Sequence, residues 1–116
     1  MNIRNMYDTT PRDLLSCHGG DGVLRHVNVY DKADFQSKLK FVNYTVLPPG
    51  TTIGYHQHAD NEEMYVILEG TGTMTIDGES TPVKTGDVIL NRPYGAHGLQ
   101  NDSDSDLKLL VFEAGM

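Results

Sequence analysis

The stretch GYHQHADNEEMYVILEG occupies residues 54–70 and places two histidines shortly before an apolar run. Side chains on a β-strand alternate between its two faces, so His56 and His58 should project from the same face. If residues 59–61 form a turn, a hairpin could bring Glu63 beside the two imidazoles. Two imidazoles and a carboxylate are the donors of a divalent metal site. The alternative is that both histidines are ordinary polar residues on a solvated strand face.

The same alternation bears on which glutamate would join the site. Glu63, Tyr65 and Ile67 share one face of the second strand, whereas Glu62 lies on the opposite face. We therefore favour Glu63 as the ligand. Tyr65 could line the pocket as a hydrogen-bond donor or acid, or it could be an aromatic residue that fills the interior.

Short β-rich runs separated by Gly, Pro, Asn and Asp continue on both sides of this stretch. Regular spacing of this kind predicts an all-β antiparallel sandwich or barrel of roughly eight strands. Asp77-Gly78 is a strong hairpin signal within the series. PRDLL at 11–15 and KADFQSKLK at 32–40 could each hold a helical turn. The predicted strands lie within 23–30, 41–47, 52–58, 62–70, 73–80, 87–93, 96–101 and 107–114.

Length and charge exclude several classes of protein. A chain of 116 residues is the size of one domain. Its net charge of −7 argues against nucleic acid and anionic membranes as partners. No apolar run approaches the roughly 20 residues of a membrane span. The single Cys17 allows no internal disulfide, so we expect a cytoplasmic protein. Cys17 and His18 could form a nucleophile–base pair, but no third orienting group is visible.

The spacing around the two histidines is informative as a whole. Gly50 is followed by five residues and His56, one residue and His58, four residues and Glu63, then six residues and Gly70. This pattern resembles the first motif of the cupin superfamily, with every position and spacing present.

A second cupin motif should then follow, opening with a glycine and containing a histidine. GDVILNRPYGAHGLQN, from Gly86 to Asn101, resembles it. His97 comes eleven residues after Gly86, and Asn101 four residues later, as in the family pattern. Pro93 and Gly95 are each displaced by one residue, so the turn differs while the histidine keeps its register.

The resemblance covers about residues 41–114 and implies the fold and domain organisation. Residues 41–116 would form an antiparallel double-stranded β-helix, or jelly-roll barrel. Residues 1–40 match no part of the pattern and would form an N-terminal arm with one strand. Because small cupins commonly dimerise, we expect a homodimer in which this arm could pair with the edge of a partner sheet.

The resemblance also implies a ligand set for a divalent transition metal. Three imidazoles and one carboxylate suit Fe, Mn, Co, Ni, Zn or Cu better than Ca or Mg. A single carboxylate leaves a charge of about +1 on a divalent ion, which favours anionic oxygen donors in the open positions. The implied ligands are His56, His58, Glu63 and His97.

Three functions remain open on these grounds. The first is a metal-dependent enzyme, of isomerase, lyase, decarboxylase or dioxygenase type, acting on a small oxygen-rich or anionic molecule. The second is a cupin that binds or senses a metal or small ligand without chemistry. The third is a metal-free cupin, which the complete ligand set disfavours. Fold alone does not choose among them.

Several other polar residues are weaker candidates for the pocket. Asn43 and Tyr44 lie on opposite faces of one strand, so at most one faces inward. Arg92 and Tyr94 flank the turn of the second motif, where Arg92 could hold a substrate carboxylate. His26 sits in a plain strand and is interpreted as structural or surface.

Overall fold

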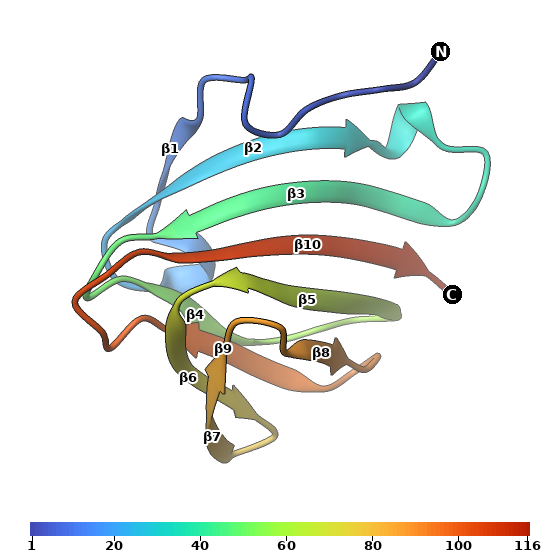
Figure 1. Cartoon of the computed structure of the whole chain (residues 1–116). Helices are drawn as coiled ribbons and strands as arrows, with labels where there is room; N and C mark the ends of the chain where they lie inside the picture. Colours follow the sequence, from blue (N-terminus) through green and yellow to red (C-terminus); the bar gives the residue numbers. More distant parts are fainter.

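Ten strands and two 3₁₀ turns account for most of the chain in a computed structural model that describes residues 1–116. The strands form two antiparallel sheets, with the order β1-β2-β3-β10-β5-β8 in one and β4-β9-β6-β7 in the other (Figure 1). This architecture confirms the predicted all-β jelly-roll class. The elements are β1 Arg12–Leu15, η1 Cys17–Gly19, β2 Val23–Asp31, η2 Lys32–Asp34, β3 Leu39–Leu47, β4 Thr52–Gln57, β5 Asn61–Glu69, β6 Thr71–Ile76, β7 Glu79–Lys84, β8 Val88–Asn91, β9 Ala96–Gln100 and β10 Leu107–Gly115.

The core lies between the two sheets and follows from strand alternation. Along β5 and β10, buried residues alternate with half-buried ones, and the buried set faces the opposite sheet. The resulting cluster contains twelve buried apolar side chains, so the interior is packed wherever the functional groups do not line it. Its members are Leu24, Leu47, Ile53, Tyr65, Ile67, Met74, Val83, Ile89, Leu99, Leu107, Leu109 and Val111.

The Asp77-Gly78 hairpin is confirmed. Both residues have positive φ, 47° and 82°, which is the combination that a tight hairpin turn of the primed type needs. The turn joins β6 to β7 in register, with Ile76 opposite Glu79.

Two local predictions were wrong. PRDLL contains strand β1 rather than a helical turn, because Arg12–Leu15 pairs along its whole length with β2. β4 and β5 do not form a hairpin either, since β4 belongs to the four-stranded sheet and β5 to the six-stranded one. The chain crosses between sheets after Gln57, so Glu63 approaches the histidines across the interior. The KADFQSKLK segment does hold a helical turn, η2.

Residues 1–40 contribute β1 and β2, two strands rather than the one expected, and both extend the sheet of their own chain. A role for this segment in dimerisation stays a prediction. Both helical turns are three residues long, and no helix of the structure could cross a membrane.

The η1 turn is fastened to β4 by backbone contacts. The Asp21 amide donates to Thr52 Oγ1 at 2.8 Å, and the Thr52 amide donates to the Asp21 carbonyl at 3.0 Å. Gly20 and Gly54 lie where the two backbones meet, and a Cβ on either would overlap backbone atoms of the other segment. Glycine at both positions therefore permits the close approach.

Candidate metal centre

The structure brings together four side chains that the family resemblance had linked. His56 lies on β4, His58 just beyond its end, Glu63 on β5 and His97 on β9. One donor atom from each falls within 4.8 Å of all the others, in an arrangement that could hold a metal ion. His56 and His97 are paired directly across β4 and β9, which fixes their spacing through the sheet ladder.

Hydrogen bonds orient two of the imidazoles toward a common point. His56 Nδ1 lies 2.7 Å from the Gly54 carbonyl oxygen, and His58 Nδ1 contacts the side-chain oxygen of Asn61. Both oxygens accept, so each Nδ1 carries the proton and each Nε2 presents a lone pair. Partners of this kind are what commonly fix the tautomer of a metal-binding histidine.

The free lone pairs converge on the Glu63 carboxylate. The Nε2 atoms of His56 and His58 are 3.3 Å apart, and His58 Nε2 is 3.3 Å from Glu63 Oε1. Three acceptors therefore face one another, and a cation among them would satisfy all three. His97 Nε2 completes the group at 3.1 Å from the same oxygen. The donor set fits a divalent transition metal.

Glu63, rather than Glu62, meets the histidines, as the strand alternation predicts. Its side chain points into the interior and the residue is only 6 % exposed. On β8, Asn91 is the direct neighbour of Glu63 and is 1 % exposed. Neither polar atom of the Asn91 side chain has a hydrogen-bond partner. An amide without partners beside the only carboxylate of the four-residue group is unusual, because buried polar groups are nearly always paired.

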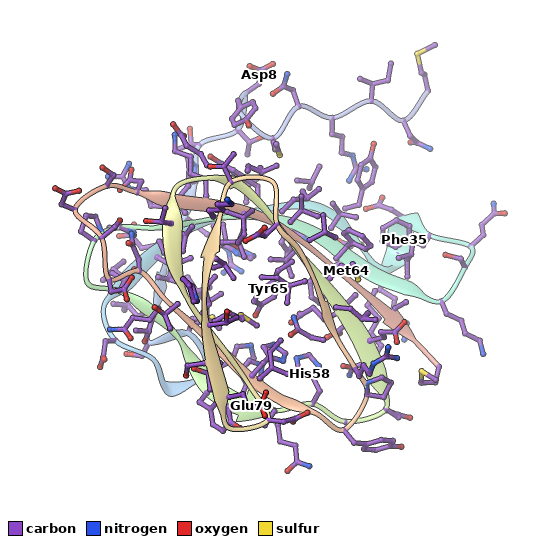
Figure 2. All side chains as sticks on the ribbon, turned by 60° about the horizontal axis from the view of Figure 1, so that its bottom comes forward. Asp8, Phe35, His58, Met64, Tyr65 and Glu79 are labelled. Atoms are coloured by element: carbon purple, nitrogen blue, oxygen red, sulfur yellow. The ribbon has the colours of Figure 1, made fainter.

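Tyr65 is buried beside the same group. Its ring meets that of His97 edge-on, with centroids 5.4 Å apart, and Figure 2 shows Tyr65 and His58 both within the ring of strands. Burial raises the pKa of the Tyr65 phenol well above its ordinary value, and the charge of Glu63 adds to this effect. In the metal-free protein the phenol therefore stays protonated and is available as a hydrogen-bonding group.

Two residues near the centre were missed by sequence reasoning as site residues. His18, in η1, stacks on His56 with ring centroids 3.7 Å apart, and burial lowers its pKa. Glu113, on β10, has Oε1 3.5 Å from His58 Nδ1. Burial raises the pKa of Glu113, and the nearby Glu63 raises it further. Both residues reach the site through tertiary contacts. The sequence had pointed to His18 only as a possible base for Cys17, and it had not pointed to Glu113.

Three cavities adjoin the four-residue group, and the smallest, about 200 Å³, is lined by Asn91, Arg92 and His97 among others. The outer one, about 360 Å³, lies over two of the three histidines and is lined by His56, His58, Asn61, Glu63 and Glu113 among others. The inner one, about 380 Å³, lies between the N-terminal segment and the inner face of β2, β3 and β10. His18, Phe41 and Glu63 line both the outer and the inner cavity.

The remaining candidates are divided between the cavities and the surface. Asn43 lines the inner cavity, whereas Tyr44 packs with Val27 and Val46 in a separate cluster. His26 also lines the inner cavity, so it is not simply a surface residue. Cys17 lines the same cavity, but burial raises the pKa of its thiol, which works against a role as nucleophile.

The two residues that flank the turn of the second motif are exposed. Arg92 lines the smallest cavity together with His97, whereas Tyr94 lines none of the three. Asn101 of the same motif organises a loop, since its amide donates to the carbonyls of Leu47 and Ser105.

Fold and site together define a small jelly-roll protein with three histidines and one glutamate gathered in its interior. The family model described as "Cupin domain" matches residues 43–113, so the chain belongs to the cupin family.

Relatives of similar length are found among both sequences and structures. The chain is 30% identical over 104 residues to an oxalate-binding protein of Thermotoga maritima, covering 90% of this chain and 86% of that protein. It is 39% identical over 87 residues to an uncharacterized protein of Methanocaldococcus jannaschii, covering 75% and 66% respectively. A crystal structure of a predicted oxalate decarboxylase from Thermotoga maritima superposes with a TM-score of 0.95 at 27% identity, covering 98% of this chain and 99% of that one.

Proposed function

We propose that this protein binds a divalent transition metal and uses it to hold a small carboxylate of the oxalate type. His56, His58, Glu63 and His97 would be the ligands. The observation that carries the proposal is that His58 Nε2 lies 3.3 Å from both His56 Nε2 and Glu63 Oε1, while the donor atoms of all four residues fall within 4.8 Å of one another. The relatives described as oxalate-binding and as a predicted oxalate decarboxylase support the choice of ligand.

The electrostatics of the group favour an anion. A bound divalent ion would polarise an oxygen ligand and, with Glu63 as its only anionic protein ligand, would keep a charge of about +1. A carboxylate ligand would offset that charge. The outer cavity supplies the access route, since it reaches Glu63 and two of the histidines.

A catalytic role is the second candidate, and Tyr65 is the residue that favours it. A buried phenol that stays protonated can donate a hydrogen bond to an oxygen on which negative charge develops, as in an enolate. Such a group would suit an isomerase, lyase or decarboxylase. A simple binding protein has less need of a donor placed beside Glu63 and His97 at this depth.

Elemental analysis of protein purified without a metal-affinity tag tests the metal, and calorimetric titration with oxalate tests the ligand. We expect close to one transition metal per chain, and oxalate binding that disappears when a chelator removes the metal. Full occupancy without any oxalate binding would contradict the ligand, and failure to take up Mn²⁺, Co²⁺ or Zn²⁺ would contradict the metal centre. Turnover of oxalate, lost in Tyr65→Phe while oxalate binding persists, would favour the catalytic candidate.

A further inference from the structure

The inner cavity offers far more room than oxalate needs. At about 380 Å³ it lies in the range of roughly 300–1,000 Å³ typical of pockets for small molecules, whereas oxalate has only two carbon atoms. It lies beside the outer cavity, since His18, Phe41 and Glu63 line both. Glu63 thus gives a ligand in the inner cavity contact with the four-residue group.

The walls of the inner cavity indicate what that extension would be. Leu14, Phe41, Ile53 and Val111 give it apolar walls. Such a lining suits a short methylene chain, because burial of apolar surface is favourable.

An exposed cation without a partner also lines this cavity. Arg12, on β1, lines the cavity directly opposite His26 on β2. The guanidinium of Arg12 makes no ion pair and no hydrogen bond, although acidic residues outnumber basic ones in this chain. Arg4, by contrast, makes an ion pair with Asp34 and is held by two hydrogen bonds. Arg12 is thus available to a ligand, and its planar fork matches a carboxylate.

We infer that the protein recognises an extended dicarboxylate, whose keto-acid or similar oxygen-rich head lies at the metal centre and whose second carboxylate reaches Arg12. This inference rests on the proposed function, because the head group requires the metal. Arg12 would act as a specificity-determining residue that binds the second carboxylate of the ligand. Oxalate would occupy only the head position and leave the inner cavity unused.

A matched pair of ligands tests the inference. 2-Oxoglutarate and 2-oxopentanoate share the keto-acid head and the length of the chain, and they differ in the terminal carboxylate alone. Calorimetry on the Mn²⁺-loaded protein should show 2-oxoglutarate bound at least tenfold more tightly, which is about 1.4 kcal/mol. In Arg12→Gln that preference should vanish, while the affinity for 2-oxopentanoate and the metal content stay unchanged.

Arg25→Gln is the matched control, because Arg25 is an exposed arginine on the neighbouring strand that does not line the cavity. It should keep the preference. Equal binding of the two keto acids by the wild type, or a preference that survives in Arg12→Gln, would overturn the inference. If oxalate and 2-oxopentanoate still bind in a metal-dependent manner, the proposed function stands and only the extended ligand is wrong. If nothing binds the loaded protein, both fail together.

Discussion

The imidazole of His18 stacks on that of His56, with ring centroids 3.7 Å apart and planes inclined by 8°. His18 holds a left-handed backbone conformation, with φ of 51°, which is uncommon for a residue other than glycine. Surrounding contacts must hold it there, and the fastening of η1 to β4 provides them. The N-terminal segment is therefore part of the wall of the metal centre.

Gly54→Ala should detach this segment. Gly54 has no positive φ, so the effect is steric: the added Cβ would overlap the His18 carbonyl oxygen and lie 2.7 Å from the Gly20 nitrogen. We expect a loss of about 1–3 kcal/mol in the free energy of unfolding, measured by urea denaturation. Gly115→Ala is the control, because its Cβ would meet nothing closer than 3.5 Å. Equal stability of the two variants would show that the segment can move aside without cost.

Glu63→Gln should lower metal affinity by more than tenfold, or about 1.4 kcal/mol, because it removes the only anionic ligand while keeping the size of the side chain. Titration with Co²⁺, followed by visible absorption, measures the change in affinity. Glu62→Gln is the control, since Glu62 lies outside the four-residue group and should bind metal normally. Normal metal binding by both variants would point to a site made of the histidines alone.

The stability of the metal-free protein should fall as the pH drops below about 6.5. Burial, and secondarily the charge of Arg12, lowers the pKa of His26 from its ordinary value of 6.5. Between that value and the folded pKa, the unfolded chain binds a proton that the folded chain does not, so acid favours unfolding. His26→Gln should reduce the loss between about pH 7.5 and 5.5 in urea denaturation. An unchanged pH profile in the variant would contradict a buried, neutral His26.

Asn91→Leu should stabilise the metal-free protein by about 1 kcal/mol, because it removes a buried amide whose two polar atoms lack partners. The matched control is Asn101→Leu. Asn101 is also buried, but it donates to the carbonyls of Leu47 and Ser105, so its replacement should destabilise. Thermal melts with a chelator present compare the two. A loss of stability in Asn91→Leu would indicate that the amide is satisfied by water or another partner.

Light scattering should give a homodimer, with twice the chain mass of 12.8 kDa. The outward face of the six-stranded sheet carries apolar residues that the chain leaves half-covered, among them the paired Val66 and Leu110. Apolar faces of this kind commonly mark contacts between subunits. Leu110→Glu should shift the mass to that of a monomer, and a monomeric wild type at micromolar concentration would refute the prediction.

Period-two alternation predicted most of the strands and favoured Glu63, because both depend on local geometry, but it missed β1. It also placed Asn43 and Tyr44 on opposite faces, as the structure confirms. His97 became a candidate only through the second motif, because nothing in its own strand distinguishes it from an ordinary buried histidine.

The contributions of Arg12, His18 and Glu113 could not be predicted in this way. Each reaches the cavities from a strand or turn that is distant in sequence from the first motif, so its place depends on how the sheets pack. The supposed β4–β5 hairpin failed for the same reason: two consecutive strands with a short link can pair or can cross between sheets, and local pattern does not distinguish these outcomes.

Because the chain crosses from one sheet to the other between β4 and β5, the four candidate ligands come from both sheets. The three histidines belong to β4, its extension and β9, whereas Glu63 belongs to β5 in the opposite sheet. An ion bound by all four side chains would cross-link the two sheets. The sheets could not separate without breaking a metal–ligand bond. Binding energy would then oppose unfolding directly. The rate of global unfolding should therefore depend on the metal occupancy of the site. Removal of the metal by a chelator should weaken the association of the two sheets.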